Sequence, residues 1–146
     1  MTISKRQQTA QSISSLIPHI IQGAHLGIFS SRSITQTQFL LLVSLHAKGP
    51  CTMSTIASHM KVQMPTMTGL VDRLVAAKYL KRLAHPKDRR QIMIELTPKA
   101  HTLIKMFQTI IAKRWEEVLG ILDEKELIQM RSIIAKLNHA MESRKS

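Results

Sequence analysis

Apolar residues near the start of the chain recur at steps of three and four, as they do along one face of an amphipathic helix. The stripe comprises Ile13, Leu16, Ile17, Ile20, Ile21, Ala24 and Ile28. The next segment, 33–50, begins with Ser and Thr cap candidates, is apolar on nearly every side and ends at Gly49-Pro50. These patterns predict a long striped helix and then a helix buried at the centre of the fold.

Two shorter helical patterns follow the central helix. Residues 54–60 predict a short helix, and residues 62–80 predict another with Pro65 in its first turn, where the missing N–H is not needed. The second helix has one apolar face and one polar face. Met67, Leu70, Val71, Leu74 and Val75 face inward, and Thr66, Thr68, Gly69, Asp72 and Arg73 face outward.

The period then changes from helical spacing to alternation. Residues 79–84 and 91–96 are strand-like runs, and the second places Ile92, Ile94 and Leu96 on one face. The polar, basic segment 85–90 between them predicts a tight turn. Helix–turn–helix followed by a hairpin with a basic tip is the order of a winged helix, so we expect a mainly α fold with a small β-hairpin wing.

Thr97-Pro98 begins a further long helical pattern, and Asp123 with Glu126 predicts a capping box for a last helix. Apolar stripes this long at both ends exceed what one small winged helix can bury, and monomers rarely keep such patches exposed. We therefore expect a homodimer. Residues 1–34 would form an N-terminal dimerisation helix, 35–96 a winged helix-turn-helix lobe, and 97–146 the C-terminal dimerisation helices.

Charge is concentrated in the middle of the chain. The formal net charge is +12, no acidic residue precedes Asp72, and nine Lys and Arg lie between Lys48 and Arg90. Such an excess favours nucleic acid or an anionic membrane as partner. Aromatic residues make up only 3%, which is low for a helix that lies on a membrane surface. The sequence therefore predicts double-stranded DNA, and no membrane, as the partner.

Two polar surfaces fit DNA recognition. Short polar side chains near the N-terminus of an inserted helix read the major groove, and an arginine at a hairpin tip can enter the minor groove. Gly69 fits a close approach to DNA and a neutral change equally well. The predicted contacts are Pro65, Thr66, Thr68, Gly69 and Arg73 on the helix, and Lys87, Asp88, Arg89 and Arg90 on the wing.

The run "PTMTGLVDRL", followed by "DRR" and then "LT", resembles the MarR family of winged-helix regulators over about residues 35–98. The resemblance implies a homodimer joined through its terminal helices on a pseudo-palindromic operator. It implies that Thr66, Thr68 and Arg73 lie on the major-groove helix and that Asp88 braces Arg90 in the minor groove. Three positions depart from the family: His85 stands where aspartate is usual, Gly69 where a basic residue is common, and Lys78 where glycine is frequent.

The resemblance also implies room for a small aromatic ligand in a crevice between the dimerisation helices and the DNA-binding lobe. The single cysteine, Cys51, is expected to be a small buried residue of a first strand, and we expect neither a metal site nor a cofactor. The candidate side chains for lining the crevice are His19, His25, His46, Phe29, Phe39 and Trp115.

No Gly-rich phosphate loop, paired acids or nucleophile–base pattern is found, so we do not expect an enzyme. One cysteine, no apolar run of membrane-spanning length and no signal peptide indicate a cytoplasmic protein. The predicted function is a sequence-specific DNA-binding transcriptional regulator, a repressor relieved by a small ligand. The alternative is a winged-helix protein-interaction module without DNA binding, which gives no reason for an arginine-tipped wing.

Overall fold

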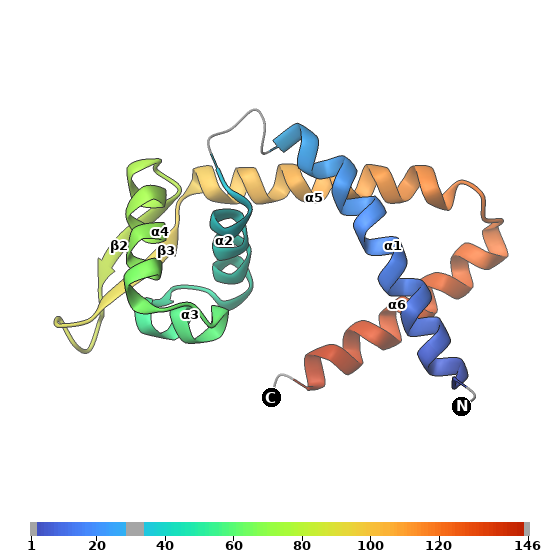
Figure 1. The fold of residues 1–146 in the computed structure, drawn as a ribbon, viewed down its shortest axis with the longest axis horizontal. Helices are drawn as coiled ribbons and strands as arrows, with labels where there is room; N and C mark the ends of the chain where they lie inside the picture. Colours follow the sequence, from blue (N-terminus) through green and yellow to red (C-terminus); the bar gives the residue numbers. More distant parts are fainter. Residues whose placement is uncertain (1–2, 29–33, 145–146) are drawn as a thin grey trace. The chain divides into compact units, whose positions relative to one another are not determined.

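The computed structural model describes residues 3–28 and 34–144, and the side chains of residues 20, 21 and 23–28 lie outside that description. Packing divides the chain into two units, 1–110 and 111–146. The described residues form six helices and three strands in the predicted order (Figure 1). They are α1 (Lys5–Ile28), α2 (Gln36–Lys48), β1 (Cys51–Thr52), α3 (Met53–Met60), α4 (Met64–Ala76), β2 (Leu80–Ala84), β3 (Ile92–Leu96), α5 (Pro98–Leu119) and α6 (Glu124–Ser143).

Helix α2 lies in the hydrophobic core of the first unit. Thr35 caps it through a capping box with Gln38, and Gly49 ends it at a φ of 83°. Leu41 and Leu42 are fully buried, whereas Leu40 and Val43 are 51% and 37% exposed. Helix α2 is therefore central to the core, as expected, but the first unit does not cover its apolar face at Leu40 and Val43.

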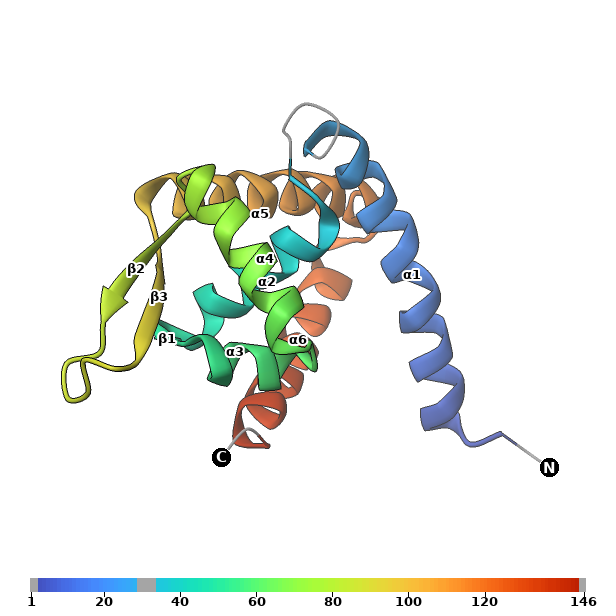
Figure 2. The ribbon, with the colours of Figure 1, turned by 60° about the vertical axis from the view of Figure 1, so that its left-hand side comes forward.

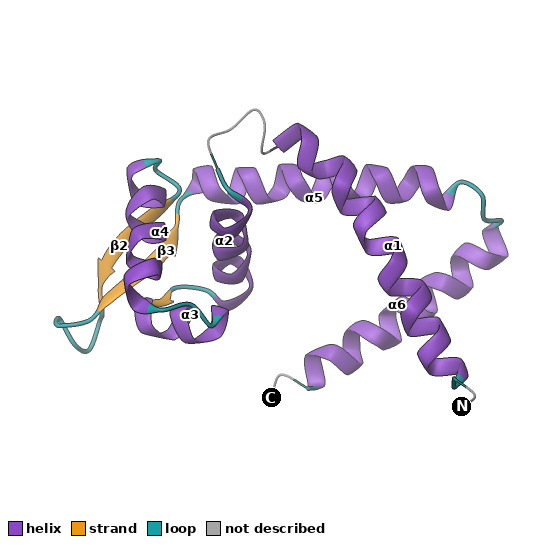
Figure 3. Ribbon diagram, in the orientation of Figure 1, coloured by secondary structure: helices purple, strands orange, loops and turns teal. Residues whose placement is uncertain are grey.

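The three strands form a small antiparallel sheet in the order β1-β3-β2 (Figures 2 and 3). Cys51 pairs with Ile94, and the β2–β3 hairpin runs in register from Leu80 opposite Leu96 to Ala84 opposite Ile92. The turn between β2 and β3 extends beyond the strands, away from the helices (Figures 1 and 2). The predicted winged helix-turn-helix fold is confirmed, and β1 is the first strand in which Cys51 was expected.

Cys51 is a buried member of this sheet, as expected. It is 9% exposed, and burial raises the pKa of its thiol, an effect that the nearby charge of Lys48 partly offsets. A thiol in such surroundings stays protonated and behaves as a small apolar side chain.

Helix α6 belongs to the second unit and begins with the predicted capping box between Asp123 and Glu126. None of its residues, 124–143, is buried. Its apolar stripe is largely open to solvent, as the exposed side chains of Ile134, Leu137 and Met141 show. In α1 the apolar side chains whose exposure is described, Ile13, Leu16 and Ile17, are about half exposed. The rest of the predicted α1 stripe, Ile20, Ile21, Ala24 and Ile28, lies outside the described side chains.

In the part of the chain that the structure covers, no helix combines the length and the apolar character needed to cross a bilayer.

Candidate nucleic-acid interface

Helix α4 is built with one buried face and one open face. Met67, Leu70, Val71 and Leu74 are buried in the core, as the spacing predicts. The helix begins after Gln63, whose side chain makes no cap hydrogen bond, and Pro65 occupies its first turn. The first N–H groups of α4 therefore have no side-chain acceptor in the described structure, and they leave a partial positive charge suited to a phosphate oxygen.

The predicted recognition residues lie on the open face of α4. Thr66, Thr68 and Arg73 are exposed, and Gly69 is half-buried. The Thr68 hydroxyl donates to the Met64 carbonyl oxygen over 2.9 Å. Its proton is thus engaged, but its lone pairs and methyl group stay available to a base amine or a thymine methyl.

A side chain at Gly69 would find open space. A Cβ built at this position meets no atom within 4 Å other than its own helix and chain neighbours. The glycine is therefore not required by packing within the chain.

An ion pair joins α4 to strand β2 of the wing. Arg82 of β2 donates through its guanidinium to the carboxylate of Asp72 on α4. Sequence reasoning placed Asp72 on the outer face but assigned Arg82 no role. The pair neutralises the one acidic residue of α4 and links the helix to the hairpin that carries the wing tip.

The wing tip is closed by hydrogen bonds to two side chains. Asp88 accepts from the Arg90 backbone N–H over 3.0 Å and lies 3.4 Å from the Gln91 side-chain nitrogen. The His85 ring nitrogen Nδ1 accepts from the backbone N–H groups of Lys87 and Asp88 over 3.1 and 3.2 Å. Asp88 thus holds the backbone of Arg90; no ion pair between the two side chains is found among the described residues.

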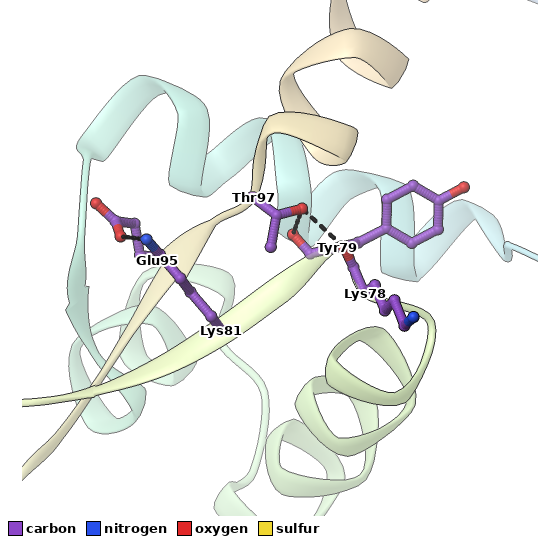
Figure 4. Close-up of polar contacts among 5 residues, drawn as sticks. All are labelled: Lys78, Tyr79, Lys81, Glu95 and Thr97. Carbon is purple, nitrogen blue, oxygen red and sulfur yellow. Dashed lines mark hydrogen bonds and ion pairs between the residues drawn. The ribbon is translucent and has the colours of Figure 1, made fainter.

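The turn after α4 explains the "LT" of the sequence motif (Figure 4). Lys78 adopts a φ of 62°, a left-handed conformation in which glycine is favoured. The Thr97 hydroxyl, at the end of β3, donates to the Lys78 carbonyl oxygen over 2.7 Å and lies 3.1 Å from that of Tyr79. Lys99 donates to the Ala77 carbonyl oxygen and lies over the Tyr79 ring. These contacts hold the turn where the family usually has glycine.

Most of the central basic residues are free to meet a polyanion. Lys81 pairs with Glu95 over 2.7 Å, as Figure 4 shows, and Arg82 pairs with Asp72. The other seven cations between Lys48 and Arg90 form no ion pair within the described part of the chain. The N-terminal end of α4 and the wing turn lie at the same end of the first unit (Figures 1 and 2). One duplex could therefore contact both.

The residues suggested for a ligand crevice have varied surroundings. Phe39 is a core residue whose ring lies 4.6 Å from that of Phe107, so it is not available to line a crevice. His46 packs edge-on against His101 at 5.5 Å, and the exposed His19 ring bonds to the Ser15 carbonyl oxygen.

Trp115 is half-buried beside a hollow of about 470 Å³ between the end of α5 and Leu127 of α6, within the second unit. The His25 side chain and Phe29 lie outside the described residues. No group of three or more histidine, cysteine or acidic residues that could hold a metal occurs in the searched, described chain.

Comparisons with known proteins agree with this architecture. The model of the MarR family matches residues 34–92. A curated relative named "HTH-type transcriptional repressor MdtR", from Bacillus subtilis (strain 168), is 33% identical over 126 residues, which are 84% of this chain and 79% of that protein.

Solved structures share the fold. The transcriptional regulator Tm0710 from Thermotoga maritima matches with a TM-score of 0.82 and 23% identity, over 94% of this chain and 96% of that chain. A mutant of MepR from S. aureus, bound to an oligodeoxyribonucleotide, matches with a TM-score of 0.68 and 23% identity, over 91% and 97%. Together with the helix-turn-helix and the wing, these matches establish that the chain belongs to the MarR family of winged-helix transcriptional regulators.

Proposed function

We propose that this chain is a homodimeric repressor that binds a pseudo-palindromic operator in double-stranded DNA and is relieved by a small ligand. The observation that carries the proposal is an open polar face on α4 beside a basic wing, with seven cations that form no ion pair in the described chain. The name of the relative MdtR includes the word repressor, and the mutant MepR structure contains an oligodeoxyribonucleotide, which supports the same reading.

The proposed contacts divide by chemistry. On α4, Thr66 and Thr68 read base edges, and Arg73 pairs with a guanine or a phosphate. Pro65 lies in the first turn of α4, and the free backbone N–H groups of that turn face a phosphate. Gly69 lets the helix backbone approach the duplex. On the wing, Arg90 enters the minor groove while Asp88 fixes the turn, and Lys87 and Arg89 contact phosphates.

Dimerisation would use the apolar faces that the single chain leaves open. We assign residues 1–34 and 97–146 to the dimer interface, since α1 and α6 expose apolar stripes that monomers rarely keep. Nuclease footprinting should then protect two half-sites about 10 base pairs apart. A footprint over one half-site would contradict the symmetric dimer.

Relief by a ligand would act through a crevice between the dimerisation helices and the DNA-binding lobe, and a small aromatic acid is the proposed class. Adding a panel of aromatic acids to a preformed protein–DNA complex should release the DNA for at least one member. If the protein keeps its DNA with every acid of the panel, even at the highest concentrations tested, this part of the proposal is rejected.

The central test is DNA binding by an Arg90→Ala variant. The affinity of the unmodified protein for a duplex selected from genomic fragments should fall steeply with salt. The logarithm of the binding constant should fall with the logarithm of the salt concentration, with a slope of about −0.9 per phosphate neutralised. Arg90→Ala should weaken binding by roughly 1–3 kcal/mol, which is the scale of one specific contact. Lys136→Ala is the matched control, because it removes the same charge from an exposed residue of α6 with no proposed DNA contact.

Each outcome of that test decides something. Unchanged affinity in Arg90→Ala would reject the wing assignment. Failure of the unmodified protein to bind any duplex with salt dependence would reject the proposed function and favour a protein-interaction module.

A further inference from the structure

The wing turn contains one contact whose chemistry depends on a proton. The His85 nitrogen Nδ1 accepts hydrogen bonds from the backbone N–H groups of Lys87 and Asp88, over 3.1 and 3.2 Å. The His85 backbone N–H in turn donates to the Gln91 carbonyl oxygen over 3.1 Å, at the other side of the turn. His85 therefore joins the start of the turn to its middle and to its end.

Only the neutral imidazole can make these contacts. A ring nitrogen that accepts from two N–H groups carries no hydrogen, so the ring proton must lie on Nε2. In the imidazolium ion both nitrogens are donors. Protonation would place an N–H at Nδ1 directly against two other N–H donors, and both hydrogen bonds would be lost.

We infer that His85 is a proton-sensitive positioning residue of the wing: its neutral ring holds the turn in the form that contacts DNA, and protonation opens the turn and weakens binding. The inference rests on the proposed DNA-binding function. Imidazole ordinarily takes up its proton at about pH 6.5. The closed turn therefore requires the neutral ring and is lost once acid has protonated it.

The surroundings of the ring reinforce the effect. Asp88 is the acidic residue of the turn, and its carboxylate already accepts from the Arg90 N–H and lies near the Gln91 side-chain nitrogen. If Asp88 turned to pair with an imidazolium, it would leave the Arg90 backbone. On β2 the cation Arg82 is paired with Asp72. The charged neighbours on the turn itself are Lys87, Asp88, Arg89 and Arg90, while the flanking strand residues Ala84 and Ile92 carry no charge.

The role of the ring can be separated from the role of a simple acceptor at this position. A carboxylate or an amide oxygen can accept from the same two N–H groups without gaining a proton near neutral pH. His85→Asn and His85→Asp should therefore keep the turn and lose the pH response. His85→Asn is the stricter control because it adds no charge at any pH.

The test compares pH profiles of DNA affinity. Fluorescence anisotropy with the selected duplex is measured at about pH 7.5 and about pH 5.5, on either side of the ordinary imidazole range, for the unmodified protein and both variants. The other six histidines are present in every protein, so their contribution cancels in the comparison. Acidification should weaken the unmodified protein roughly three- to tenfold more than His85→Asn, the scale of one or two neutral hydrogen bonds.

A readout without DNA tests the turn itself. Nitrogen–proton correlation spectra should show the His85 Nε2–H tautomer at neutral pH, and hydrogen exchange of the Lys87 and Asp88 amides should accelerate on acidification relative to His85→Asn. A protonated or Nδ1–H ring at neutral pH would overturn the inference.

The binding outcomes separate the two proposals. Identical pH profiles for the unmodified protein and His85→Asn, or tighter binding of the unmodified protein in acid relative to the variant, would overturn the role of His85 alone. The second result would mean that added positive charge outweighs the turn. Loss of duplex binding by every protein at both pH values would instead reject DNA binding, and this inference with it.

Discussion

Replacing Thr97 by valine would test how the turn after α4 is joined to the end of β3. Valine keeps the branched shape and exchanges the hydroxyl for a methyl group, so no cavity forms. The hydroxyl donates to the Lys78 carbonyl oxygen over 2.7 Å, and its oxygen lies 3.4 Å from the Ala100 backbone nitrogen in the first turn of α5. The variant therefore removes one strong hydrogen bond and one weak helix cap.

The expected cost follows from these two contacts. A neutral hydrogen bond contributes about 0.5–1.5 kcal/mol net, and the exposed Lys78 carbonyl can find water instead, which favours the lower half of that range. A strong N-cap contributes about 1 kcal/mol, and the long 3.4 Å contact contributes less. Thr97→Val should therefore lower the free energy of unfolding by roughly 0.5–1.5 kcal/mol, or Tm by about 1–6 °C.

Urea unfolding followed by circular dichroism would measure this loss. All variants are compared at one protein concentration, because the proposed dimerisation would make apparent stability concentration-dependent. Thr97→Ser keeps the hydroxyl and is the matched control, so it should keep most of the stability that Thr97→Val loses. If Thr97→Val unfolds like the unmodified protein, or if Thr97→Ser loses as much as Thr97→Val, the hydroxyl does not hold the turn.

Three further results are expected. Gly69→Ala should raise the free energy of unfolding by about 1 kcal/mol in urea titration, since its Cβ meets open space, and a loss would contradict the open site. Lys78→Gly should change stability by less than about 1 kcal/mol, because relief of the left-handed conformation is offset by the entropy of glycine. Cys51 should react with a thiol reagent only slowly in the folded protein, because burial raises the pKa of its thiol, and fast modification would contradict that burial.

The hydrophobic pattern alone predicted the order of the helices and strands, the buried face of α4 and the basic wing turn. Those features are local: Met67, Leu70, Val71 and Leu74 recur at helical spacing, and alternation along 91–96 marks a half-buried strand. Periodicity of this kind records which side of an element faces the core. Periodicity does not predict which distant side chain each residue contacts.

Contacts between distant residues were therefore decided by the tertiary structure. Asp72 meets Arg82, and Thr97 meets the Lys78 carbonyl nineteen positions away, only because α4 packs beside the hairpin. The exposed face of α2 at Leu40 depends on how far its neighbours extend around it. The two hydrogen bonds to His85 span two and three residues, but they require the backbone turn that β2–β3 pairing imposes. Composition and spacing pointed to the surface that we propose binds DNA, whereas three-dimensional packing determined what holds that surface in shape.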